Sequence, residues 1–111
     1  MPINSKAKGS AGEREAANLF KQHGFTEARR SQQYSGAGHT ADLTGIDGLH
    51  IEVKRVERLN IYDAIEQVYR DKAPTDYGVV MHRKNNQEWL ITMTFDEWIE
   101  LYKNYVKGNE K

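Results

Sequence analysis

The segment 41–56 constrains the fold more than any other part of this chain. Within it, two runs rich in apolar residues, 41–46 and 49–56, flank the pair Asp47-Gly48. An Asp-Gly pair between two such runs is a strong signal for the tight turn of a β-hairpin. The sequence therefore predicts two antiparallel strands that are joined at this turn.

The second of these strands would present charged side chains on one face. Because successive residues of a strand point to opposite sides, its apolar residues at 49, 51 and 53 would face the core. Glu52 and Lys54 would then project together from the other face. Pairing across the hairpin would bring Asp42 near the latter half of this strand, within reach of an ion shared with Glu52.

Two carboxylates and a lysine on one face predict a divalent metal site that faces a phosphate. Carboxylate oxygens suit Mg²⁺, a hard cation that keeps part of its water shell. When bound, such an ion supplies an activated water and neutralises charge on a phosphoryl oxygen. Lys54 would orient that water or stabilise the developing negative charge. The chain has no cysteine and no histidine cluster, so zinc chemistry is not expected.

The same residues also have purely structural interpretations. Glu52 and Lys54 could form a surface ion pair, which would stabilise the fold only slightly. Asp42 could end a loop by accepting a hydrogen bond from its own backbone. The presence of all three residues in one predicted hairpin favours the metal site over these interpretations.

Length and composition limit the class of protein. The 111 residues suffice for one domain, 1–111, with one core. The absence of cysteine excludes a disulfide scaffold and fits a reducing compartment. We see no long apolar run and no signal-peptide pattern, so we expect a cytoplasmic protein without a membrane segment. The formal net charge of zero argues against bulk electrostatic coating of nucleic acid.

The N-terminal third predicts a helix and an extended segment. Residues 1–8 are expected to form a flexible polar N-terminus. Ser10 and Glu13 have the spacing of a capping box, which marks a helix start, and Gly24 marks the end of that helix. Residues 25–33 are typical of an edge strand or extended segment, which a glycine-containing loop then connects to the hairpin.

The part that follows the hairpin predicts two helices and two strands. Asn60 is expected to cap a helix that ends before Pro74. Two strands, 77–82 and 89–93, would enclose a polar turn. A second capping-box pattern begins at Thr94 and opens a last helix rich in aromatic residues. The predicted order is α-β-β-β-α-β-β-α, an α/β domain with a mixed central β-sheet flanked by helices.

Several short motifs occur in the order and spacing of a known family. They lie at 9–15, 24–25, 30–31, 41–42, 51–54, 54–60 and 64–67. On these motifs the chain resembles the PD-(D/E)xK nuclease superfamily, above all its Holliday-junction resolvase branch of archaeal and phage-encoded proteins. A departure is Ala41, where the motif name has a proline, a residue that binds no metal. The resemblance implies a restriction-endonuclease-like core and a phage or prophage origin.

The resemblance also implies roles for the acids and the lysine. Asp42 and Glu52 would be metal ligands assisted by the backbone carbonyl of Val53, and Lys54 would be the catalytic lysine. Glu13 matches the acid on the first helix of the family, which approaches the metal from the side. A capping role for Glu13 is the structural alternative, and both roles can coexist. Mg²⁺ is the implied cofactor, with Mn²⁺ as an alternative.

A further set of residues matches polar positions that the family uses beside the site or against DNA. These residues are Arg14, Arg29, Arg30, Ser31 and Gln67, and we add Ser35 and His39 of the glycine-containing loop as candidate DNA contacts. An extra residue in this chain leaves open whether Arg29 or Arg30 makes the contact, and the arginines could also form an ordinary polar edge strand. The loop that carries Ser35 and His39 would settle on the DNA. His39 lies next to the predicted site in the sequence, where it could act as a general base or be a solvated loop histidine. Gln67 could be a plain surface position on its helix.

Branched DNA, most of all a four-way junction, is the partner that the resemblance implies. A junction must be nicked symmetrically on two strands, so a homodimer is expected. Trp89, Trp98 and Tyr102 could form its surface or belong to the core. Our main hypothesis is a metal-dependent, structure-specific endodeoxyribonuclease. The alternatives are a nuclease that acts on flap, nicked or duplex DNA, a non-catalytic DNA-structure-binding protein, and a protein-interaction domain without nucleic acid.

Overall fold

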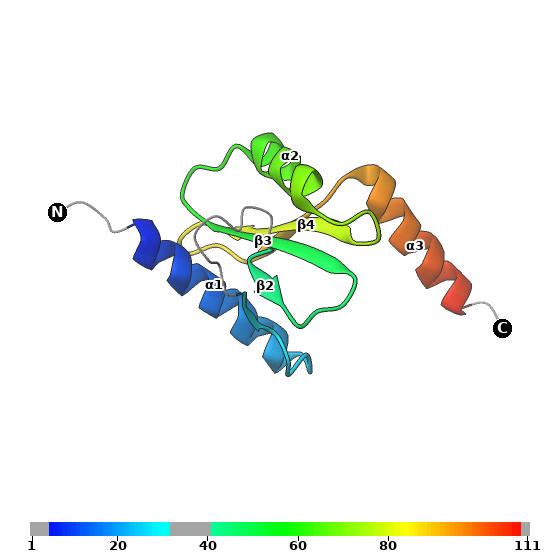
Figure 1. Cartoon of the computed structure of the whole chain (residues 1–111), viewed down its shortest axis with the longest axis horizontal. Helices are drawn as coiled ribbons and strands as arrows, with labels where there is room; N and C mark the ends of the chain where they lie inside the picture. Colours follow the sequence, from blue (N-terminus) through cyan, green and yellow to red (C-terminus); the bar gives the residue numbers. More distant parts are fainter. Residues whose placement is uncertain (1–4, 32–40, 110–111) are drawn as a thin grey trace.

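A single mixed sheet of five strands lies between two helices (Figure 1). The computed structural model describes residues 5–31 and 41–109. Its elements are, in chain order, α1 (Ser5–Gln22), β1 (Arg29–Arg30), β2 (Leu43–Thr44), β3 (Leu49–Arg55), α2 (Ile61–Asp71), β4 (Tyr77–Arg83), β5 (Leu90–Thr92) and α3 (Phe95–Asn109). The strands lie in the order β1-β2-β3-β4-β5, with β3 and β4 parallel and the other neighbours antiparallel. The prediction of an α/β domain with a mixed sheet flanked by helices is confirmed.

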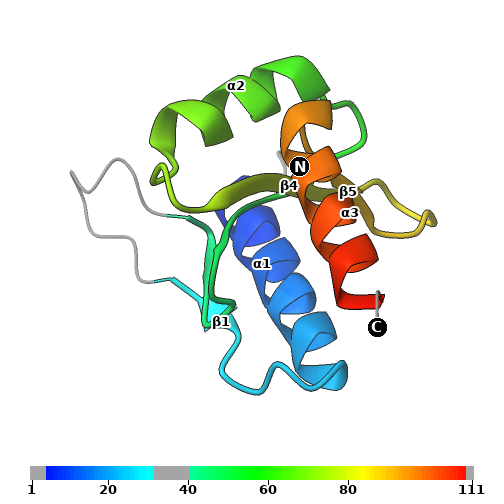
Figure 2. The same ribbon diagram turned by 90° about the vertical axis from the view of Figure 1, so that its right-hand side faces the viewer.

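The two faces of the sheet are covered by different helices (Figure 2). One face packs against α1, where Ile51 and Val53 of β3 join Ala16 and Ala17 of the helix in one buried cluster. The other face packs against α2, where Val68 of the helix is buried with Val80 of β4. The apolar residues of β3 therefore face the core as predicted. Glu52 lies on the other face, as predicted, but α2 covers that face and Glu52 is buried beneath it.

The β2–β3 hairpin is confirmed, with a shorter first strand than predicted. Leu43 pairs with Ile51, and the N–H of Leu49 donates to the carbonyl of Ile46 across the turn at 3.4 Å. Gly45 adopts a φ of +88° and lies directly against the backbone of Glu27, where a side chain would collide. This left-handed glycine ends β2 at Thr44, two residues before the predicted end.

The start of α1 corrects the capping-box prediction. The helix begins at Ser5, so Ser10 and Glu13 lie inside it rather than at its first turn. Their side chains accept hydrogen bonds from Arg30, Ser10 from Nη2 at 3.1 Å and Glu13 from Nε at 3.1 Å. Residues 5–8 were predicted to be flexible and are helical, whereas 1–4 lie outside the described residues.

Helices α2 and α3 are capped by the residues that the sequence predicted. The Asn60 side chain accepts a hydrogen bond from the N–H of Asp63 at 3.1 Å, and Thr94 Oγ1 accepts from the N–H of Glu97 at 3.3 Å. The Glu97 carboxylate does not close the capping box. It accepts instead from the N–H of Gly78 and the hydroxyl of Tyr69, each at 2.8 Å, and so ties the start of α3 to β4 and α2.

Glu15 connects α1 to three other parts of the fold. Its Oε1 accepts from Arg83 Nη1 at 2.6 Å and from Trp89 Nε1 at 3.0 Å, and its Oε2 accepts from Arg55 Nε at 3.1 Å. Trp89, which was predicted to lie either in the core or on a dimer surface, packs against the α1 cluster. One carboxylate thus satisfies donors from β3, from β4 and from the segment before β5.

Replacing Glu15 with alanine should lower the free energy of unfolding by about 2 kcal/mol, because it leaves two partly buried guanidinium groups and an indole N–H without this acceptor. Residual water access to the 37%-exposed Glu15 side chain keeps the loss moderate. Urea denaturation would measure it, with the exposed Glu66→Ala on α2 as the control. Equal losses in the two variants would contradict this role of Glu15.

In the described part of the chain, no helix combines the length and the apolar composition that a membrane crossing needs.

Candidate active site

Asp42 is held in place by the strands on either side of it. Its N–H donates to the carbonyl of Ile51 at 2.9 Å, and its own carbonyl accepts from the N–H of Ser31 at 3.0 Å. Its Oδ2 accepts from the N–H of Val53 at 2.8 Å, in place of a backbone acceptor from β2. Asp42 is only 7% exposed. The hairpin therefore fixes this carboxylate against β3, as the sequence predicted.

Glu52 lies beside Asp42 on the face that α2 covers. It is 6% exposed, and its Oε1 accepts from Gln67 Nε2 of α2 at 3.1 Å. Burial raises the pKa of Glu52 to about 7, and the negative charge of Asp42 contributes to the increase. Near neutral pH, this carboxyl group is therefore poised between its protonated and ionised forms.

Lys54 shares the face of Glu52, two residues further along β3. Its positive charge opposes the increase in the pKa of Glu52. Lys54 is half-buried and lies next to His82 of β4 in the sheet. Among the described residues, no acid forms an ion pair with Lys54. Its ammonium group thus acts on Glu52 through its charge, without an ion pair to a described acid.

Glu13 of α1 interacts electrostatically with Asp42. Burial raises its pKa, and the charge of Asp42 raises it further, whereas the hydrogen bond from Arg30 acts in the opposite direction. The predicted catalytic acid of the first helix is therefore electrostatically coupled to Asp42. The ion pair of Glu13 with Arg30, at 3.1 Å, also fixes this helix against β1.

The candidate oxygen ligands at this site are two side chains and one backbone carbonyl. Within the described residues, no group of three or more His, Cys, Asp or Glu side chains is arranged to hold a metal ion, so Glu13 does not complete a side-chain triad. Asp42 and Glu52 supply two carboxylates. The Val53 carbonyl points to the same edge as its N–H, which is the edge of Asp42. Two carboxylates, a carbonyl and waters match the coordination of Mg²⁺, and a cation would relieve the repulsion that raises the pKa of Glu52.

A basic hollow lies next to this site on α1 and β1. It has a volume of about 340 Å³ and is lined by Arg14, Ala17, Asn18, Lys21, Arg29 and Arg30. The predicted contacts Arg14, Arg29 and Arg30 are thus brought together. Lys21 and Asn18 were missed, although their spacing of seven and four residues from Arg14 on one helix was a usable signal. Arg29 is exposed, whereas Arg30 also bonds to Glu13.

The remaining residues that the sequence predicted beside the site or against DNA are Ser31, Gln67, Ser35 and His39. Ser31 donates its hydroxyl to the carbonyl of Ala41 and so helps to hold the chain next to Asp42. Gln67 lies on the buried side of α2 beside Glu52 rather than on a plain surface position. Ser35 and His39 lie outside the described residues.

His50 is a buried residue near the site that sequence reasoning missed. It lies two residues before Glu52 on β3, is 5% exposed, and its Nε2 has no hydrogen-bond partner in the described structure. Burial lowers the pKa of His50, which favours the neutral imidazole. Its position on the face of Glu52 follows from strand alternation, so the spacing alone was a usable signal.

Comparison with known proteins adds no assignment. No protein-family model matches the chain, and neither a curated protein nor a solved structure is significantly similar to it. The chemistry of the site therefore has to be argued from its own residues. They form two adjacent buried carboxylates, a neighbouring lysine, a coupled glutamate on α1 and a basic hollow beside them.

Proposed function

We propose that this protein is a metal-dependent endodeoxyribonuclease with a restriction-endonuclease-like core, and that it hydrolyses phosphodiesters in branched DNA, above all in four-way junctions. The observation that carries the proposal is that the Asp42 carboxylate is bound to the Val53 N–H of β3, beside Glu52 and Lys54, which share one face of that strand. An ion-pair interpretation accounts poorly for this group, because the negative charge of Asp42 disfavours the ionised form of the neighbouring, buried Glu52.

Each residue of the site has a defined task in this reaction. Asp42 and Glu52 would hold Mg²⁺ together with the Val53 carbonyl, and the bound ion supplies an activated water and charge neutralisation at phosphorus. Gln67 holds the Glu52 carboxyl in place through a 3.1 Å hydrogen bond. Lys54 stabilises the negative charge that develops on the phosphoryl oxygens during in-line attack by water. Glu52 must lose its proton to act as a ligand, so activity should increase as pH rises through about 7.

The basic hollow is suited to a DNA backbone. Arg14, Lys21 and Arg29 present cations on one side of the site, and guanidinium groups pair well with phosphate oxygens. This concentration of positive charge lets a chain of zero net charge bind DNA locally. The hollow borders Glu13 through Arg30, so a strand that lies in it would pass close to the carboxylates.

Arg14→Ala and Lys21→Ala should each weaken DNA binding by several-fold at moderate salt and reduce the salt dependence of binding by about one counterion. Fluorescence anisotropy over a range of salt concentrations would measure both quantities. Lys84→Ala, an exposed lysine in the turn after β4, is the matched control and should leave both unchanged. Identical effects of all three variants would show that binding does not use the hollow.

The function is tested by comparing a labelled synthetic four-way junction with a linear duplex of the same sequence, each with Mg²⁺, Mn²⁺ or EDTA. Paired symmetric nicks on the junction alone, and only with metal, are the expected result. Equal cutting of both substrates would support the nuclease activity but contradict the preference for junctions. Tight junction binding without cleavage in either metal would contradict the proposed nuclease activity and favour a DNA-structure-binding protein.

A further inference from the structure

A pocket of about 540 Å³ lies at the carboxyl ends of the parallel strands β3 and β4. From the sheet it is lined by His82 of β4 and Leu90 of β5, which are register partners and therefore point to the same face. Leu59 and Ile61, on either side of the residue that caps α2, line it from the helix. In open α/β sheets, ligands commonly bind outside the carboxyl ends of the strands, and this volume is typical of ligand pockets.

The pocket adjoins the proposed active site through Lys54. Lys54 and His82 are neighbours in the β3–β4 ladder, so their Cα atoms are about 4.8 Å apart and their side chains share one face of the sheet. Asp42 lies at the other edge of β3, where it accepts from the N–H of Val53. Across the sheet, Lys54 therefore lies between the Asp42 carboxylate and the pocket.

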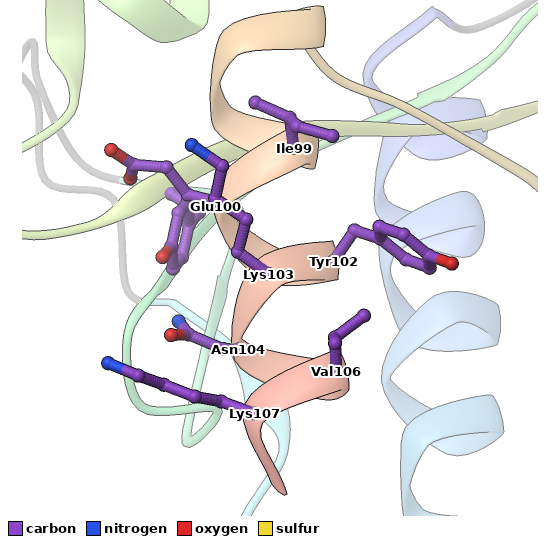
Figure 3. Close-up of a pocket in the computed structure, with 8 residues that line it drawn as sticks. Ile99, Glu100, Tyr102, Lys103, Asn104, Val106 and Lys107 are labelled. Atoms are coloured by element: carbon purple, nitrogen blue, oxygen red, sulfur yellow. The ribbon is translucent and has the colours of Figure 1, made fainter. Parts of the chain in front are cut away.

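A larger hollow, of about 800 Å³, lies away from this site along α3 (Figure 3). Its lining residue from the sheet is Tyr77, which begins β4 and pairs with Leu49, the first residue of β3. This hollow is therefore at the amino ends of the parallel strands, whereas Lys54 is near their carboxyl ends. Of the two, the smaller pocket is the one that a substrate bound at Lys54 would meet.

The elements around the smaller pocket are fixed by hydrogen bonds. The Nε2 atom of His82 bonds to Thr92 Oγ1 at 2.8 Å, which holds the imidazole in place. The Glu57 carboxylate accepts from the N–H of Asn85 at 2.6 Å and so joins the segment after β3 to the turn between β4 and β5. The pocket is thus formed before any ligand binds, which reduces the ordering cost of binding.

The lining of the pocket suits a flat ring with a polar edge. The imidazole of His82 is itself flat, and proteins stack nucleobases on such rings. The exposed Gln87 offers an amide donor and an amide acceptor, which are the groups that bind base edges. Apolar side chains supply much of the remaining lining, and these are Val56, Leu59, Ile61 and Leu90.

The charges around the pocket favour a neutral group inside it. The pocket has two cationic and two acidic lining residues, Arg83, Lys84, Glu57 and Glu88. Arg83 already forms an ion pair with Glu15 at 2.6 Å. Burial lowers the pKa of His82, so its imidazole adds no positive charge at neutral pH. A phosphate is therefore better placed at Lys54, which has no ion pair with a described acid, and an uncharged ring in the pocket.

We propose that a single nucleobase, turned out of the DNA stack next to the cleaved phosphate, occupies this pocket. The inference rests on the proposed nuclease function and names the feature of the substrate that the site recognises. Successive nucleotides of a strand are about 3.4 Å apart along a duplex, so a nucleotide adjacent to the phosphate at Lys54 is the one that reaches the pocket. Turning a base out costs least where it is unpaired, so the pocket favours branched DNA over linear duplex.

Binding of four-way junctions that lack one base would test the pocket. Fluorescence anisotropy in EDTA compares the intact junction with junctions that carry an abasic nucleotide at each position flanking the branch point in turn. Leu90→Trp, which fills the pocket, should weaken binding of the intact junction several-fold. It should have no effect on the junction that lacks the captured base, because both changes remove the same contact. Equal effects of Leu90→Trp on all of these junctions, or no effect on any, would overturn the proposal.

Ile91→Trp is the matched control for the added bulk. Ile91 pairs with Met81, so it lies on the same strand as Leu90 but points to the opposite face of the sheet. Leu90 and Ile91 are 57% and 55% exposed, so both variants should fold, as circular dichroism would show. The control should bind the intact junction as the natural chain does. A loss of binding in Ile91→Trp equal to that in Leu90→Trp would contradict a role for the pocket.

2-Aminopurine at the same positions reports directly on the base, because its fluorescence increases when it leaves the stack. Binding of the natural chain in EDTA should increase the fluorescence several-fold at one position next to the branch point, and binding of Leu90→Trp should not. No increase at any flanking position with the natural chain bound would overturn the proposal.

These measurements are made without metal, so they do not depend on cleavage. Cleavage of the junction without any coupling between Leu90 and a base would overturn the pocket and leave the nuclease proposal in place. Coupling without cleavage in Mg²⁺ or Mn²⁺ would contradict the nuclease activity and assign the pocket to a DNA-structure-binding protein. A chain that does not bind the junction at all would contradict both proposals.

Discussion

Replacing Lys54 with alanine is expected to slow DNA cleavage by about 10²–10³-fold, because the variant lacks the cation that stabilises charge developing at phosphorus. DNA binding should change little, since most contacts with the backbone are expected in the basic hollow of α1 and β1. Lys54 makes no ion pair with a described residue, so its removal should also leave the free energy of unfolding nearly unchanged. A large loss of rate without a loss of stability distinguishes a catalytic lysine from a structural one.

Asp42→Asn should abolish cleavage more completely. The asparagine retains an oxygen that can accept the hydrogen bond from the Val53 N–H, so β3 stays in place. It removes the negative charge that contributes to the raised pKa of Glu52, so the variant should be at least as stable as the natural chain. An inactive variant without a stability defect is hard to reconcile with a purely structural role for Asp42.

Single-turnover cleavage of the labelled junction, with anisotropy on the same DNA in Ca²⁺ or EDTA, would separate chemistry from binding. Lys84→Ala provides the matched control for the loss of one lysine. Cleavage at the natural rate by either Lys54→Ala or Asp42→Asn would show that the site is assigned wrongly. A parallel decrease in binding and cleavage would instead place the affected residue in DNA contact.

The sequence predicted best those features that depend on neighbouring residues. The turn at Asp47-Gly48, the cap at Asn60 and the start of α3 after Thr94 all follow from residues within four positions of each other. The alternation of β3 likewise placed Glu52 on the face opposite Ile51. Local steric and hydrogen-bonding rules suffice for such features, because few alternative partners compete for these groups.

The features that were wrong or missed depend on distant residues. The spacing of Ser10 and Glu13 resembles a capping box, but both side chains bond to Arg30, which is 20 and 17 positions away. The burial of Glu52 depends on where α2 packs against the sheet, and no local sequence pattern determines that position. The sequence left open whether the aromatic face of α3 was core. With α1 and α2 already covering the sheet, that face remains exposed.

Glu52→Gln is expected to stabilise the metal-free protein at alkaline pH. The folded-state pKa of Glu52 is about 7, above the ordinary value of 4.5, so the folded state binds this proton more tightly than the unfolded state does. The resulting stabilisation is fully present below about pH 4.5 and is lost as pH rises through about 7. Between these limits it amounts to at most about 3 kcal/mol. Glutamine cannot ionise, so the stability of the variant should not fall in this way as pH rises.

Urea unfolding in EDTA at about pH 5 and pH 8 would measure the difference. At the lower pH the two proteins should have similar stabilities, and at the higher pH the variant should be more stable by about 1–3 kcal/mol. The lowered pKa values of His50 and His82 change stability in the same range, but they contribute equally to both proteins and cancel. Gln67 can still donate to the glutamine oxygen, so the comparison isolates the charge.

Glu97→Gln provides a control of opposite sign. Burial would raise the pKa of Glu97, but hydrogen bonds from Gly78, Tyr69 and Lys72 outweigh it and lower the pKa. That stabilisation is present above the ordinary pKa and is lost as pH falls, so Glu97→Gln should destabilise the protein at neutral pH. A structural acid is therefore expected to stabilise the fold when ionised, and Glu52 to do the reverse.

Addition of Mg²⁺ tests the metal site, because an ion bound by Asp42 and Glu52 must displace the proton of the Glu52 carboxyl group. Mg²⁺ should therefore raise the stability of the natural chain more at about pH 8 than at about pH 6, and should raise that of Glu52→Gln far less. If the stability of the natural chain in EDTA does not fall between pH 5 and pH 8 relative to that of Glu52→Gln, Glu52 does not have the raised pKa that we assign to it. If the stability falls in this way but neither Mg²⁺ nor Mn²⁺ raises it, Glu52 has a raised pKa but the site does not bind a metal ion.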